Sequence, residues 1–85
     1  MKYQEGLDST KEWLRSSSKA EILLVLNEAG LSTKKTKIVL SKFCDEQARD
    51  HASYDLAMHQ STYSKKLTEA LYKVRSALRW LGLID

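Results

Sequence analysis

The chain has 85 residues, of which 42% are hydrophobic and 29% are charged, and its net charge is +3. A domain of this length buries only about 60–65% of its unfolded surface, so a single compact core is the upper limit. This excludes a barrel, a doubly wound sheet and a deep enclosed active site. We expect one domain over residues 1–85 that binds a partner and has no catalytic activity.

A single cysteine, Cys44, excludes an intramolecular disulfide and a multi-cysteine zinc site. The sequence has no 18-residue apolar run, and its first residues lack the apolar stretch of a secretion signal. We therefore expect a reducing compartment, which means the cytoplasm, or the nucleoid or nucleus, and no contact with a membrane.

The absence of proline and the presence of only three glycines indicate helices, and no alternating run of strand length occurs. We predict a mainly α domain of three to five helices. Residues 1–17 are expected to form an extension whose short helix is capped by Asp8 or Ser9 and carries Trp13 and Leu14. Residues 18–85 are expected to form the core of the domain.

The clearest helix start lies at Ser18, because Ser18 and Glu21 have the spacing of a capping box. Apolar residues then recur on one helical face, and Gly30 stands where a left-handed residue ends many helices. These signals predict a helix over residues 19–29.

A second helix is predicted from about 33 to 47, with Ser32 or Thr33 as its N-cap and Val39, Leu40 and Phe43 on its apolar face. Residues 48–61 either extend this helix or open a loop, with a further helical turn possible between Tyr54 and His59. The pattern of the sequence leaves both alternatives open.

The last helix has the most regular apolar pattern. We predict that it begins at Ser61 or Ser64 and extends over residues 62–80, approximately. It is expected to end at Gly82, and residues 83–85 are expected to be extended. Its apolar residues occupy a narrow arc. They are Tyr63, Leu67, Ala70, Leu71, Val74, Ala77, Leu78 and Leu81.

The opposite face of this helix carries side chains that suit DNA. They are Lys65, Thr68, Tyr72, Arg75 and Arg79. Arginine pairs bidentately with guanine or phosphate, while threonine and tyrosine contact phosphate oxygens or thymine methyl groups. The alternative is an ordinary solvated helix face.

Three lysines at the start of the second helix, Lys34, Lys35 and Lys37, are candidate contacts to the DNA backbone. A solvated face is again the alternative, since lysines at a helix N-terminus oppose the helix dipole. Positive charge is segregated along the chain, because residues 19–42 and 61–85 each have a net charge of +3 whereas residues 43–60 have −3. Such segregation favours a nucleic-acid partner.

The helix at 19–29, the turn over 29–34 and the ending Val74-Arg75-Ser76-Ala77-Leu78-Arg79-Trp80-Leu81-Gly82-Leu83-Ile84-Asp85 resemble the winged helix-turn-helix superfamily. The resemblance implies a helix-turn-helix-like core whose recognition helix is residues 62–80. Two features depart from the superfamily pattern. Residues 48–61 are longer than its tight turn, and the sequence stops at Asp85, where the second wing strand should follow. The alternatives are a fragment of a longer protein, a winged helix whose wing is truncated or missing, or a helical bundle that shares only this ending.

The sequence thus predicts a double-stranded DNA-binding domain, either a transcription regulator or another DNA-transaction factor, with the last helix in the major groove. A homodimer is expected because two half-sites multiply specificity. The alternative is a small protein-interaction or adaptor domain without nucleic-acid binding, and a weaker one is binding of RNA or single strands.

No catalytic site, metal site or cofactor is predicted. Cys44, His51 and His59 lie too far apart in sequence to indicate zinc, and Cys44 lies on an apolar helix face. Trp13 and Trp80 are expected to pack together along the edge of the domain; the alternative is an exposed aromatic contact for a protein partner or a second subunit.

Overall fold

The computed structural model describes residues 2–84, with side chains from Leu7 onward. Five helices follow one another along this part of the chain, which contains no strand. They are α1 (Lys2–Ser16), α2 (Lys19–Glu28), α3 (Thr33–Phe43), α4 (Arg49–Asp55) and α5 (Gln60–Trp80). The predicted mainly helical architecture is confirmed.

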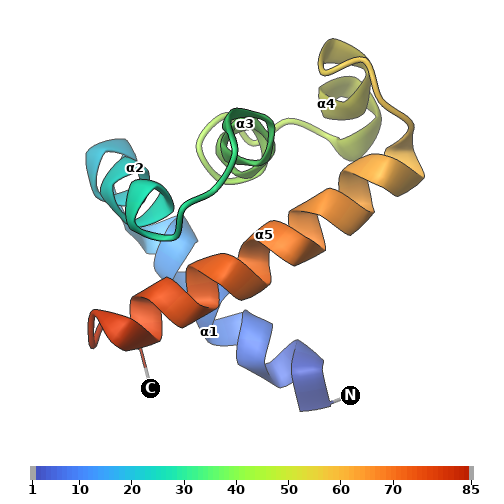
Figure 1. The fold of residues 1–85 in the computed structure, drawn as a ribbon. Coiled ribbons are helices and arrows are strands. Elements are labelled where there is room, and N and C mark those ends of the chain that lie inside the picture. Colours follow the sequence, from blue (N-terminus) through green and yellow to red (C-terminus); the bar gives the residue numbers. More distant parts are fainter. Residues whose placement is uncertain (1, 85) are drawn as a thin grey trace.

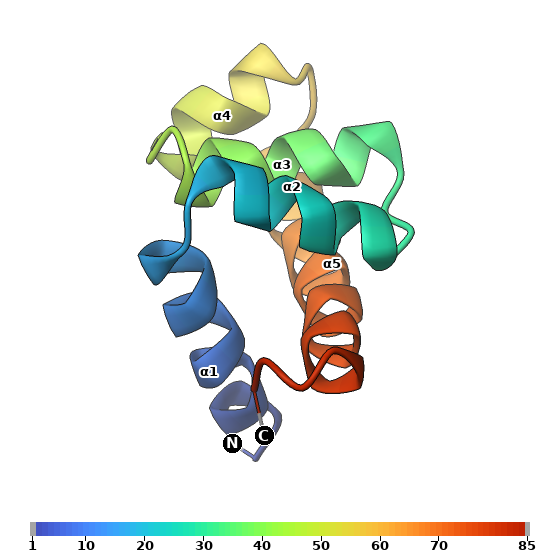
Figure 2. The same ribbon diagram turned by 90° about the vertical axis from the view of Figure 1, so that its left-hand side faces the viewer.

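The long helix α5 organises the bundle, because each of the other four helices contacts it. Helices α2, α3 and α4 lie in a row along one side of α5, and α1 crosses it on another side (Figure 1). After a 90° turn, α2, α3 and α4 form a layer above α1 and α5 (Figure 2). This arrangement leaves one long face of α5 uncovered.

Two clusters of buried side chains hold the helices together. The larger cluster joins α1, α2 and the C-terminal part of α5, with Val39 from α3. The smaller cluster consists of Ile38, Ala52 and Tyr63, from α3, α4 and α5. Leu67 packs against both clusters and connects them.

The predicted ends of α2 are confirmed. The Glu21 amide donates to the Ser18 hydroxyl over 3.2 Å, and the Ser18 amide donates to the Glu21 carboxylate over 2.9 Å. Gly30 follows the helix with φ +70°, and Gly82 follows α5 with φ +74°. Glycine adopts this left-handed conformation without a steric penalty, which explains why both helices end there.

The prediction of a short N-terminal helix capped by Asp8 or Ser9 is wrong, since α1 has 15 residues and passes through both positions. Leu7, Thr10 and Leu14 are buried along it at helical spacing. Their burial against the bundle stabilises a continuous helix where local capping preferences favoured a break.

The second helix is shorter than predicted, because α3 ends at Phe43 and not near residue 47. Glu46 adopts φ +52°, and the amides of Asp45 and Gln47 donate back to the carbonyls of Leu40 and Ser41. A separate helix, α4, then follows. Residues 48–61 therefore neither extend α3 nor form only a loop. They contain a separate short helix, in which Ala52 and Ser53 are buried.

Helix α5 begins at Gln60, one residue before Ser61, and Ser64 is wrong as its start because Tyr63 is already a buried helical residue. At the other end, the Leu83 amide donates to the Leu78 carbonyl over 2.8 Å, so residue 83 closes the helix and does not begin an extended segment. Asp85 lies outside the described residues.

Candidate nucleic-acid interface

The uncovered face of α5 carries all five residues that the sequence singled out on this helix. Lys65, Thr68 and Arg79 are exposed, while Tyr72 and Arg75 are half-buried. The buried residues of α5 share one side of the helix, where Leu67 also packs. The five candidate residues lie on the other side, and Tyr72 among them packs partly against the larger cluster. We call these five residues the α5 outer face.

The charge on α5 is strongly unbalanced. Five basic residues occur between Gln60 and Trp80, against one acidic residue, Glu69. Glu69 itself forms an ion pair with Lys35 of α3, with 3.4 Å between the ammonium nitrogen and the carboxylate oxygen. The only acidic side chain on α5 is therefore already matched by a charge from another helix.

The three lysines near the start of α3 do not form one group. Lys35 is directed toward α5 through its ion pair with Glu69. Lys34 and Lys37 are exposed and line a hollow between α3 and α4 together with Asp55. The carboxylate of Asp55 reduces the attraction of that hollow for a phosphate. The structure thus brings one of the three lysines to α5 and places two beside α4.

A further basic group was missed by sequence reasoning. Lys11 and Arg15 of α1 and Lys42 of α3 line a hollow against the side of α5 that carries Ser64 and Thr68. We call this the α1–α3–α5 hollow. The spacing of Lys11 and Arg15, four residues apart on a helix, was a visible signal, but the third cation comes from a different helix.

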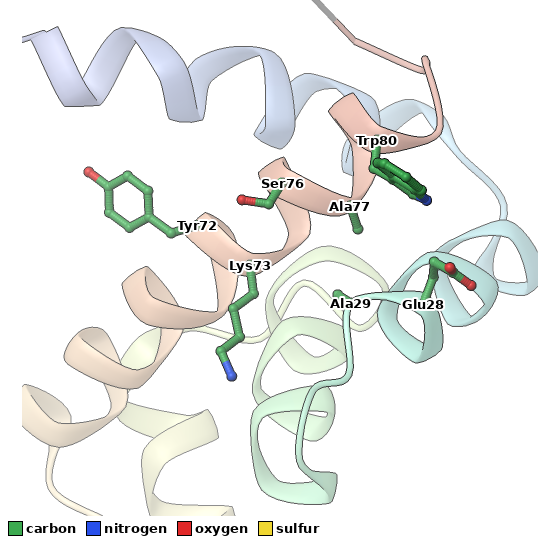
Figure 3. A pocket seen from close by; sticks show the side chains of 7 residues that line it. All are labelled: Glu28, Ala29, Tyr72, Lys73, Ser76, Ala77 and Trp80. Carbon is green, nitrogen blue, oxygen red and sulfur yellow. The ribbon is translucent and has the colours of Figure 1, made fainter.

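A third hollow, which we call the α2–α5 hollow, lies between the end of α2 and α5 and has a volume of about 530 Å³ (Figure 3). Glu28 and Ala29, at the end of α2, line it together with Lys73 and Trp80 of α5. The Trp80 side chain is 80% exposed, so the expectation that it packs along the domain edge is wrong. Trp13, by contrast, is half-buried against the larger cluster.

Cys44 is half-buried at the end of α3. Burial raises the pKa of its thiol, with Lys19 opposing this effect and Asp45 adding to it. Because the thiolate is the nucleophile, this environment disfavours a reactive cysteine.

His51 lies in α4 and His59 is the N-cap of α5. The Nε2 atom of His51 lies 3.8 Å from the Oδ2 atom of Asp55, and both side chains are exposed. Among the side chains that the structure describes, from Leu7 to Ile84, no group of three or more histidine, cysteine, aspartate or glutamate residues is placed to hold a metal ion. No helix in this part of the chain is both long and apolar enough to cross a membrane.

Comparisons with models of protein families, with characterised proteins and with solved structures found no match to this chain.

Proposed function

We propose that this domain binds double-stranded DNA without catalysis, and that α5 enters the major groove through its outer face. The observation that carries the proposal is the division of α5 into two faces. Its inner side contributes to both buried clusters, while its outer side presents cations and hydroxyl groups to solvent.

The dimensions of α5 suit this role. Its 21 residues span about 30 Å at 1.5 Å per residue. The major groove is about 12 Å wide and admits one α-helix. Arg75 and Arg79 are the proposed contacts to base edges or phosphates, with Lys65, Thr68 and Tyr72 as further contacts along the same helix.

On this proposal the fold is a helix-turn-helix-like variant without a described wing, in which α5 is the recognition helix and α4 occupies the connection after α3. Lys34, Lys35 and Lys37 would supply backbone contacts, of which Lys35 has to exchange its bond with Glu69 for one with phosphate. The domain would act in transcription regulation or in another DNA transaction.

Titration of a fluorescent random duplex at about 50 and 200 mM salt tests the proposal. We expect binding that weakens by about 100-fold between the two conditions, as for about four phosphate contacts. Replacing Arg75 and Arg79 together by glutamine should weaken binding by about ten-fold or more at low salt.

The matched control replaces Lys19 and Arg49 by glutamine, which removes the same charge from exposed positions on α2 and α4. We expect this variant to keep most of its affinity. Circular dichroism establishes that both variants fold. Absence of duplex binding by the unmodified chain at low salt contradicts the proposal, as does equal weakening in both variants.

A second candidate function is protein interaction through the α2–α5 hollow, and the 80% exposure of Trp80, which lines this hollow, favours it. Tryptophan is frequent among residues that dominate interface energies. Glu28 and Lys73 carry opposite charges in the same hollow, so a two-fold axis would pair Glu28 of one copy with Lys73 of the other. We therefore propose a second copy of this chain as the occupant.

Sedimentation equilibrium over a range of concentrations tests this candidate. A dimer that Trp80→Ala dissociates, and that Trp13→Phe leaves intact, supports it. A monomer at all concentrations contradicts it without affecting the proposal for DNA.

A further inference from the structure

The α1–α3–α5 hollow gathers three cations from two helices. Lys11 and Arg15 project from successive turns of α1, and Lys42 projects from the last turn of α3. The hollow has a volume of about 260 Å³, and Ser64 and Thr68 of α5 line its opposite side. It therefore combines positive charge with hydroxyl groups in a space that admits a small ligand group.

The three cations have no carboxylate partner within 4.0 Å in the part of the chain that the structure describes, where the ion pairs are Lys35–Glu69 and His51–Asp55. Glu46, which is exposed, lines an adjoining hollow together with Arg15 and Lys42. One exposed carboxylate does not neutralise three cations, so the hollow attracts anions.

Contacts within the domain position the guanidinium group of Arg15. It lies over the ring of Phe43, 5.8 Å from the ring centre. A cation–π contact of this kind holds the group without using its N–H donors. These donors remain available for the paired hydrogen bonds that arginine makes with phosphate oxygens.

The α5 side of the hollow adds a hydrogen-bond donor. The Thr68 hydroxyl donates to the carbonyl of Ser64 over 3.0 Å, whereas the Ser64 hydroxyl donates to no described group. Leu7 and Leu71 form an apolar floor. An apolar floor excludes water from one side of the cations, which strengthens their attraction for an anion.

We propose that the α1–α3–α5 hollow binds a phosphate group. Resting on the proposed function, this is a backbone phosphate of the duplex that α5 engages, with the adjoining sugar against the leucine floor. Thr68 connects the two surfaces, because it belongs to the α5 outer face and also lines the hollow. The hollow thereby extends the DNA contact from α5 onto α1 and α3.

The test compares the salt dependence of duplex binding in two charge-matched variants. Arg15→Gln with Lys42→Gln removes two proposed phosphate contacts, and the slope of log affinity against log salt should become less steep by about one for each. Lys19→Gln with Arg49→Gln removes the same charge elsewhere and should leave the slope unchanged. A third variant, Lys11→Gln with Lys42→Gln, also removes two proposed phosphate contacts but keeps the contact between Arg15 and the Phe43 ring, and its slope should become less steep by the same amount.

The outcomes separate this inference from the proposed function. If the unmodified chain binds duplex and the hollow variants keep its slope, the phosphate site is overturned while the role of α5 stands. If the unmodified chain binds no duplex, the proposed function fails, and a titration of the isotope-labelled chain with inorganic phosphate then decides the inference.

In that titration, saturable shifts of the Lys42, Ser64 and Thr68 amide signals support a site for a free phosphate, provided that the Arg15→Gln, Lys42→Gln variant loses them. Unchanged spectra overturn the site.

Discussion

The part of the bundle around α1 and α2 is constructed differently from the part around α4. In the first, leucine, isoleucine and valine side chains from α1, α2 and α5 meet in one large apolar cluster. In the second, the buried cluster has three members, Ile38, Ala52 and Tyr63, and two buried serines, Ser41 and Ser53, lie on the same helices. Apolar burial stabilises the first region, whereas hydrogen bonds contribute a larger share of the stability of the second region.

The helix ends differ in the same way. Helix α2 begins with a complete capping box and ends at Gly30, whereas the N-cap of α4, Ala48, makes no side-chain hydrogen bond. Helix α4 has seven residues and is followed by Ala57 with φ +55°, a conformation that glycine adopts more readily. We conclude that α4 and its connections are the weaker region of the domain.

The largest expected effect comes from the larger cluster. Leu26 is 1% exposed, and Leu26→Ala should lower the free energy of unfolding by about 2–5 kcal/mol because it leaves a cavity among packed side chains. Leu56→Ala, at a half-buried position beside the smaller cluster, should lower it by about 1 kcal/mol. Urea denaturation measures both, and equal losses would contradict the comparison.

The smaller cluster should respond to loss of a single hydroxyl group. The Tyr63 hydroxyl and the Ser41 hydroxyl lie 2.9 Å apart, and Ser41 also donates to the Ile38 carbonyl over 2.7 Å. Tyr63→Phe should lower the free energy of unfolding by about 1 kcal/mol. Tyr54→Phe is the matched control, since Tyr54 is 82% exposed, and a similar loss in both variants would exclude a specific role for the buried bond.

Two of the left-handed positions, Gly30 and Ala57, should respond to substitution in opposite directions. A Cβ atom at Gly30 meets nothing within 4 Å, so the cost of Gly30→Ala is conformational and is expected to be about 1 kcal/mol. Ala57→Gly should raise the free energy of unfolding by about 0.5 kcal/mol, because relief of the left-handed alanine outweighs the added freedom of the unfolded chain. Thermal denaturation followed by circular dichroism gives the sign of each change.

The smallest effect is expected for the ion pair between α3 and α5. The side chains of Lys35 and Glu69 are 19% and 46% exposed, and a partly exposed pair contributes about 0.5 kcal/mol or less. A double-mutant cycle with Lys35→Gln and Glu69→Gln measures this coupling energy, which should fall at high salt. A coupling that does not depend on salt would show that the two side chains interact by packing.

Elements with strong local signals were predicted well, and those that depend on distant contacts were not. Ser18, Glu21 and Gly30 define α2 through bonds within a few residues, so their pattern was sufficient. The start of α1 was misplaced because burial of Leu7 and Thr10 against other helices outweighs the capping preference of Asp8 and Ser9. Helix α4 has few residues and no capping bond, so its sequence carries little local information.

The candidate site likewise was predicted only where it depends on contacts that are local in sequence. The periodicity of α5 predicted which of its residues face outward, because helical geometry alone determines this. The α1–α3–α5 hollow depends on how three helices cross, and no single segment encodes that crossing. The pairing of Lys35 with Glu69 likewise joins residues that are distant in sequence.

The central position of α5 has a consequence for synthesis of the chain. Both buried clusters include residues of α5, so neither can be completed until the ribosome has translated residues 60–80. Until then α1 to α4 emerge with apolar side chains accessible to chaperones and proteases, and only α2 has strong local signals to form early. Folding of this domain is therefore expected to be a single late event and not a stepwise process during translation.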